Sequence, residues 1–170
     1  MRNQKTRKIA LAALFASMAI VLKTFLSIQL GDSMRISLFP IPLLIGGFLL
    51  GPLWGLLIGF VTDTVYFMIS PFASFWSVYT ISTMIWGLGG GLIKLVPVKK
   101  DLWKYIIIIA ITTILETLIN TLANVIYGFS NATLLWRVLA MIIRFPFLVF
   151  TTQIILKQFL LLMDSNPLEK

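Results

Sequence analysis

Apolar runs of about 20 residues recur along almost the whole chain, and short polar or proline-containing stretches separate them. A helix of that length crosses the roughly 30 Å hydrocarbon core of a bilayer. The pattern predicts an all-α integral membrane protein in which residues 1–170 form one membrane-embedded domain. The six predicted transmembrane helices are 9–26, 38–50, 53–69, 75–96, 102–127 and 133–163.

The second of these segments is the least regular. It is short, and it contains Pro40, Pro42 and a glycine pair, which predicts a broken or tilted helix. Irregular backbone at membrane depth is tolerated only against protein or a water-filled cavity. Residues 27–37 form a polar connection before it, and Gly51-Pro52 predicts a tight turn after it. Four spans would result if the second and third segments formed a re-entrant pair.

The basic residues indicate how the chain lies in the membrane. Ten of the 14 Lys and Arg residues flank the first span, the connection between the fourth and fifth, and the end of the sixth. With six spans all ten fall on one side, which predicts cytoplasmic termini in a multi-pass protein of the cell membrane. The net charge of +8 suggests contact with anionic lipid headgroups rather than with nucleic acid. The run 9–26 is longer than the apolar part of a signal peptide, so we interpret it as a retained span.

Composition narrows the chemistry. Of all residues 59% are hydrophobic, and the chain has neither cysteine nor histidine. Disulfides, thiolate catalysis and most transition-metal sites are thereby excluded, and we expect no metal, cofactor or catalytic residue. Phosphate-binding and nucleophile motifs are also missing. An enzyme would need Asp63 and Glu116 as a carboxylate pair for acid–base catalysis.

Six ionisable residues lie inside or beside the apolar runs. A charge in the bilayer costs roughly 2.5–3.5 kcal/mol on insertion scales, so it usually faces a partner or a polar cavity. Counting about 1.5 Å per helical residue places Asp63, Glu116 and Arg144 near the midplane. The six carry a surplus of two positive charges, which favours an anionic ligand. They are Lys23, Arg35, Asp63, Glu116, Arg137 and Arg144.

Polar and aromatic side chains accompany these charges on helix faces. Glu116, Asn120, Asn124 and Tyr127 recur at helical spacing, and Arg137 lies seven residues before Arg144. Aromatic residues beside a polar cluster suit a flat heterocyclic ligand. Two simpler readings stay open: Arg144 pairs with Glu116 or Asp63 as an interhelical lock, or the outer cations extend to headgroups. Further candidates for the site are Tyr66, Trp76 and Tyr79.

Small residues at four-residue spacing predict close helix contacts. Ala12 and Ala16 form such a pair in the first span, and Gly55 and Gly59 form one in the third. We interpret the glycine-rich stretch 87–92 as helix packing rather than as a phosphate-binding loop.

Several of these stretches resemble one transporter family. Residues 35–67, RISLFPIPLLIGGFLLGPLWGLLIGFVTDTVYF, look like the second and third helices of the substrate-binding S components of energy-coupling factor (ECF) vitamin transporters. ALAALFA resembles the Ala-x-x-x-Ala motif of their first helix. Within the family the chain looks most like the folate-specific S component, on the basis of Arg35-Ile36-Ser37, Asp63, PFASFWSVYTIS and the arginines of the last helix.

The resemblance implies a binding function without catalysis. An S component binds a vitamin tightly from the outside and docks on a transmembrane coupling protein that carries two cytoplasmic ATPases. Ala12 and Ala16 would contact the coupling protein. Folate would place its carboxylates near Arg35, Arg137 and Lys23, and its pterin edge near Asp63 or the two asparagines. The alternatives are an S component for another vitamin, such as riboflavin or pantothenate, and a membrane assembly protein that binds no ligand.

Overall fold

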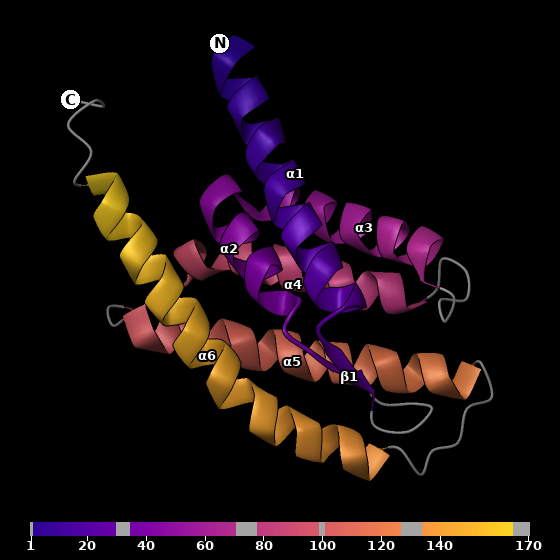
Figure 1. Ribbon diagram of the computed structural model, residues 1–170. Helices are drawn as coiled ribbons and strands as arrows, with labels where there is room; N and C mark the ends of the chain where they lie inside the picture. The colour runs from indigo at the N-terminus through magenta and orange to yellow at the C-terminus, as the bar shows by residue number, and fades with distance from the viewer. Residues whose placement is uncertain (1, 30–34, 71–77, 99–100, 127–133, 165–170) are drawn as a thin grey trace.

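The computed structural model describes residues 2–29, 35–70, 78–98, 101–126 and 134–164. In these segments the chain forms six α-helices, one 3₁₀ turn and a two-stranded hairpin (Figure 1). The prediction of an all-α architecture with six helices is confirmed, and the hairpin is a small addition to it. The elements are α1 (Arg2–Thr24), β1 (Ser27–Gln29), β2 (Arg35–Ser37), α2 (Pro40–Leu50), α3 (Pro52–Ile69), α4 (Val78–Leu92), η1 (Ile93–Leu95), α5 (Asp101–Ile126) and α6 (Leu134–Asp164).

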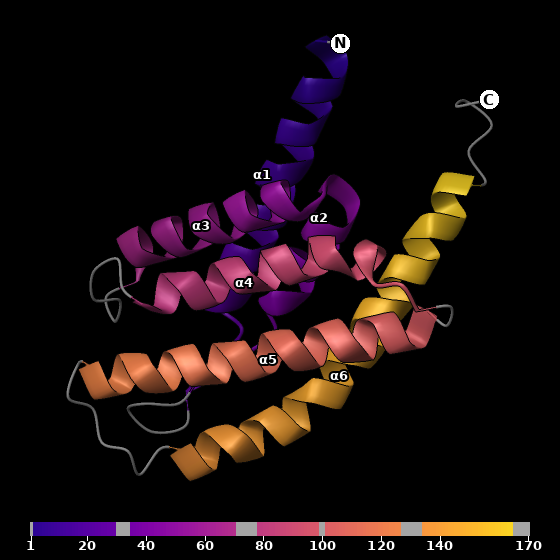
Figure 2. The ribbon, with the colours of Figure 1, turned by 180° about the vertical axis from the view of Figure 1, so that it is seen from behind.

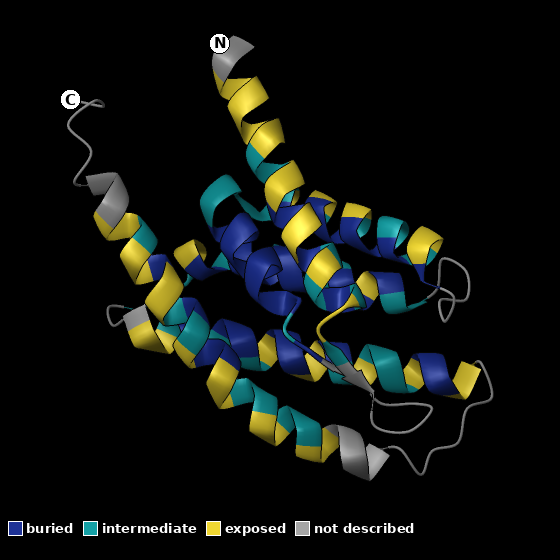
Figure 3. Cartoon of the chain, viewed as in Figure 1, coloured by how far each residue is buried: buried dark blue, intermediate teal, exposed yellow. Residues whose placement is uncertain are grey.

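The helix α1 begins seven residues before the predicted start of the first span. Its basic first turns contain good helix formers, and residues 4–10 are all exposed where the helix extends beyond the bundle (Figure 3). After α1, part of the predicted polar connection forms the antiparallel hairpin. Ser27 pairs with Ser37, and Gln29 pairs with Arg35.

The helix α2 is regular, which corrects the prediction of a broken helix. Pro40 and Pro42 lie in its first turn, where the missing backbone N–H groups have no helical partner to lose. The predicted turn after it is confirmed. Gly51 has φ +103°, a conformation that only glycine adopts readily, and its N–H donates to the carbonyl of Gly47. The next helix then starts at once with Pro52.

Glycines let α2, α3 and α4 approach each other backbone to backbone. A Cβ added to Gly55 would collide with the backbone of Gly87, and one added to Gly87 would collide with Gly55. A Cβ on Gly59 would lie 2.7 Å from the Cα of Met84. The interpretation of the stretch 87–92 as packing is therefore confirmed, since Gly90 and Gly91 also lie against backbone of the neighbouring helices.

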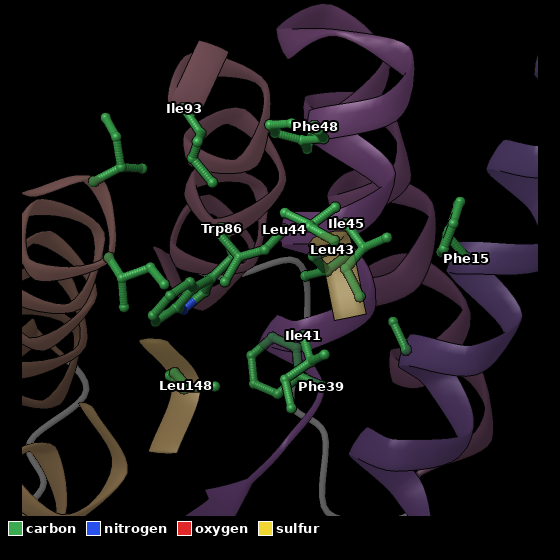
Figure 4. Close-up of a cluster of buried hydrophobic side chains, with 14 of the residues drawn as sticks. Phe15, Phe39, Ile41, Leu43, Leu44, Ile45, Phe48, Trp86, Ile93 and Leu148 are labelled. Carbon is green, nitrogen blue, oxygen red and sulfur yellow. The ribbon is translucent and has the colours of Figure 1, made fainter. Parts of the chain in front are cut away.

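The helix α4 lies between α3 and α5 in both ribbon views (Figures 1 and 2), and α3, α4 and α5 alternate in direction. It is shorter than the predicted segment 75–96. The α-helix ends at Leu92 and is followed by the 3₁₀ turn η1. Val96 then has an extended backbone because Pro97 follows it. Residues 75–77 lie outside the described part of the chain. Trp86 of α4 is fully buried together with Leu43 and Leu44 of α2, and Figure 4 shows these side chains in one apolar cluster.

The helices α5 and α6 match the predicted segments within one residue at each described end. Three stretches of the described chain are long and apolar enough, by length and composition, to cross a membrane: Pro52–Ile69, Leu102–Ile126 and Val138–Leu161. Large apolar side chains such as Leu118 and Phe150 are exposed on the outside of the bundle. Such a surface suits lipid better than water. The start of α1 and the end of α6 lie toward the same end of the bundle in both ribbon views.

Candidate functional site

Lys23 and Asp63 form a buried ion pair between α1 and α3. Asp63 uses both of its oxygens, because Thr80 donates to Oδ2 at 2.6 Å and Thr83 donates to Oδ1 at 3.1 Å. Lys23 also donates to the Thr83 hydroxyl at 3.0 Å. We call these four residues the Lys23 network. It joins the end of α1 to the middle of α3 and to the first half of α4.

The aromatic rings of two neighbours complete the environment of Lys23. Its Nζ lies 4.9 Å from the ring centre of Phe39 and 4.8 Å from that of Tyr66, both within the range of cation–π attraction. Lys23 is only 9% exposed. The reading in which it extends to lipid headgroups is therefore wrong for this residue.

A second, largely buried ion pair joins α5 and α6. Arg144 donates through Nη2 to Oε2 of Glu116, and its guanidinium carbon lies 5.6 Å from the ring centre of Trp86 on α4. The predicted interhelical lock is confirmed for Arg144 with Glu116. Asp63 is not part of it, because its partner is Lys23.

The predicted stripe on α5 faces this second pair and α4. Tyr79 donates its hydroxyl hydrogen bond to Oδ1 of Asn124, which connects the first turn of α4 to α5. Glu116 and Asn124 are buried, and Asn120 lies between them on the same face. Tyr127, the last residue of the stripe, lies outside the described residues.

Three buried polar atoms of this region have no hydrogen-bond partner within the described chain. They are Oδ1 of Asn120, Nε of Arg144 and Nε1 of Trp86. Such an atom is costly to bury unless another polar group reaches it. Sequence reasoning did not select Trp86, because a tryptophan within an apolar span is typical of a core residue. We call Trp86, Glu116, Asn120 and Arg144 the Arg144 cluster.

For several other candidate site residues the structure describes the backbone alone or nothing at all. Arg35 lies in β2 and Arg137 in the first turn of α6, but their side chains are outside the described part of the structure. Trp76 lies outside the described residues altogether. Ala16 is 4% exposed and belongs to the core, and Ala12 packs against that core. The exposed face of α1 contains Ala13 and Ser17 instead.

The two ion pairs separate the predicted polar site into two regions on different sides of α4. Asp63 neutralises Lys23 on the α3 side, and Glu116 neutralises Arg144 on the α5 side. The two remaining cations of the predicted polar site are Arg35 and Arg137, whose side chains lie outside the described part of the structure. Among the described residues no group of three or more acidic side chains gathers that could hold a metal ion.

Residues 7–162 match the model of the family "ECF transporter, substrate-specific component". The chain belongs to this family of S components. It is therefore a multi-pass protein of the cell membrane and the substrate-binding part of a transporter rather than an enzyme.

Two solved structures have a similar fold. The crystal structure of FolT bound with folic acid matches with a TM-score of 0.73 and 23% identity, covering 85% of this chain and 89% of that one. An S component of a bacterial ECF transporter matches with a TM-score of 0.68 and 16% identity, covering 95% and 99%. At these identities the likeness concerns the fold. No curated protein sequence matches the chain significantly.

Proposed function

We propose that this S component binds folate with high affinity at the outer face of the membrane. The observation that carries the proposal is the fold likeness to FolT bound with folic acid, over 85% of the chain. The resemblance of residues 35–67 to the folate-specific S components supports it from the sequence. The distribution of buried charges adds an argument of its own.

Folate has two carboxylates and one flat pterin ring, and the cations of the predicted polar site suit the carboxylates. We assign the carboxylates to Arg35 and Arg137, the two cations of that site that remain once Lys23 and Arg144 are paired with protein carboxylates. Guanidinium groups bind carboxylates with two parallel hydrogen bonds. Lys23 is not carried into this assignment, because Asp63 neutralises it and two aromatic rings surround it.

The pterin ring requires hydrogen-bonding groups and an aromatic contact. Asp63 is not carried forward for this role, since its oxygens are engaged by Lys23 and the two threonines. Asn124 already accepts from Tyr79. Asn120 has an unpartnered Oδ1, so we assign the pterin edge to Asn120. Trp76 and Tyr79 stay proposed as the aromatic contacts of the ring.

Delivery requires the partners of the family. We propose that the termini are cytoplasmic and that the protein docks on a coupling protein with two ATPase subunits. The face of α1 that is free for such a contact contains the small residues Ala13 and Ser17, whereas Ala16 is buried. Small exposed residues permit close approach of another helix. We therefore propose contact through this face.

A ligand panel on the purified protein tests the binding function. Thermal unfolding is measured in detergent with folate, riboflavin, pantothenate and thiamine. A ligand at about 100 times its dissociation constant stabilises by roughly 2.7 kcal/mol, which is easily measured. Of the four vitamins, only folate is expected to raise the melting temperature. A shift with another vitamin and none with folate would contradict the assignment of folate and keep an S component for that vitamin.

A further inference from the structure

The Arg144 cluster contains more hydrogen-bonding capacity than the described protein satisfies. Arg144 Nε–H and Trp86 Nε1–H are unpartnered donors, and Asn120 Oδ1 is an unpartnered acceptor. Trp86 is fully buried, and its ring lies against the guanidinium group of Arg144. Asn120 is one helical turn from Glu116, the partner of Arg144. The three atoms thus belong to one small region between α4, α5 and α6.

The charge of the cluster restricts what it can bind. Arg144 and Glu116 neutralise each other, so a ligand carboxylate placed here would meet no net positive charge. It would also lose its hydration, a loss that only a compensating cation offsets. The cluster offers two N–H donors and one acceptor oxygen. A neutral ring that carries both hydrogen-bond acceptors and N–H donors can pair with all three of these atoms.

The Arg144 cluster also lies at a different depth from Arg35 and Arg137, the two arginines to which we assign the folate carboxylates. Trp86 lies eight residues beyond the start of α4 and Arg144 ten residues beyond the start of α6, which is about 12 and 15 Å along the helices. Arg137 lies in the first turn of α6, and Arg35 lies in the hairpin. The cluster is therefore separate from the positions assigned to the carboxylates.

We infer that Trp86 and Arg144 are specificity-determining donors for the neutral heteroaromatic ring of the substrate, with Asn120 as acceptor, and that Glu116 positions Arg144. This inference rests on the proposed function, in which the ring is a pterin. A pterin has a ring carbonyl and ring nitrogens that accept hydrogen bonds, beside N–H groups that donate them. Glu116 holds Nη2 of Arg144, which leaves Nε–H for the ring.

Fragment binding tests the inference on the full chain in detergent. Dissociation constants are measured for folate, for pterin and for p-aminobenzoylglutamate, with wild type, Trp86→Phe and Arg144→Lys. The first variant removes Nε1–H and keeps an aromatic ring, and the second keeps the positive charge for Glu116 but loses Nε. In each variant the affinity for folate and for pterin is expected to fall about 5- to 10-fold, which is the effect of one lost hydrogen bond. Affinity for p-aminobenzoylglutamate is expected to stay unchanged.

The control is Thr152→Val. Thr152 of α6 is also fully buried, and its Oγ1 is also without a partner, but it lies eight residues beyond Arg144. Its removal is expected to leave all three affinities unchanged. Melting temperatures without ligand identify any variant that fails to fold. If one donor variant fails to fold, the other donor variant tests the inference.

The outcomes separate the two proposals. If wild type does not bind folate, both the proposed function and this inference are overturned. If wild type binds folate and both donor variants bind pterin as tightly, only the inference is overturned. An equal loss of pterin and p-aminobenzoylglutamate affinity would indicate a general structural effect and would also overturn it.

Discussion

Lys23 and Asp63 are 40 residues apart in the chain and form a buried ion pair between α1 and α3. Thr80 and Thr83 of α4 donate further hydrogen bonds to the carboxylate. Three helices are thus connected through one aspartate at membrane depth, where an uncompensated charge is expensive.

Breaking this pair from one side should destabilise the protein strongly. Lys23→Met leaves Asp63 buried without its cation, and loss of one partner of a buried pair costs about 3–5 kcal/mol. The double variant Lys23→Met/Asp63→Leu removes both charges and is expected to be much closer to wild type. Thermal unfolding in detergent measures both. Equal stability of the single and double variants would contradict an energetic role of the pair.

Replacing Gly87 by alanine should disturb the packing of α3 against α4. The added Cβ collides with backbone of Gly55, which has no side-chain freedom with which to yield. Overpacking costs typically 1–3 kcal/mol. Gly46→Ala is the matched control, since its Cβ would meet side-chain atoms of Ile58 and Phe15 at 3.0 and 3.1 Å. The melting temperature is expected to fall clearly more for Gly87→Ala, and a reversed order would reject the backbone contact.

Arg137 should affect binding rather than folding. Arg137→Ala removes a cation assigned to a folate carboxylate, so affinity is expected to fall several-fold or more while the melting temperature without ligand stays the same. Lys157→Ala is the control, because Lys157 is an exposed basic residue 20 positions further along α6. Calorimetric titration with folate measures both variants. Normal binding by Arg137→Ala would show that the assignment is wrong.

The exposed face of α1 should affect docking without affecting binding. Ala13→Trp places a bulky side chain where we propose that the coupling protein approaches. Co-purification with the coupling protein and ATPases is expected to be lost, while folate binding is retained. Val61→Trp, on the exposed side of α3, is expected to leave co-purification unchanged. Retained assembly of the α1 variant would exclude this face as the contact.

The helices could be predicted because each is encoded by a local run of apolar residues. One ion pair could be predicted because the depth of a charged residue in the membrane can be counted along its helix. Glu116, Asp63 and Arg144 lie at similar counted depths, so counting along the chain predicted that Arg144 pairs with Glu116 or Asp63, and the structure shows that the partner is Glu116. The Lys23–Asp63 pair was missed, since counting placed Lys23 nearer the outer face than Asp63. Helix tilt and the length of the lysine side chain decide this contact, and sequence spacing contains neither.

Three other features could be established only from the structure, each for a different reason. The glycine stretch 87–92 predicts packing, but its partners depend on how three helices cross. Trp86 has no distinguishing pattern in the sequence, because its unpartnered Nε1 is a property of its neighbours. Ala12 and Ala16 had the spacing of a contact motif, yet the rotation of α1 turns Ala16 toward the core and Ala13 outward.

The helix α2 has 11 residues and is about 16 Å long, well short of a roughly 30 Å hydrocarbon core. Residues 40–48 are nevertheless buried by protein, so almost none of this helix meets lipid. The short length of α2 therefore does not require the bilayer to thin around it. The longer, exposed helices α3, α5 and α6 determine how well the protein matches the thickness of the membrane. Lipids of different acyl length should therefore change the tilt of those helices while α2 keeps its position among its protein neighbours.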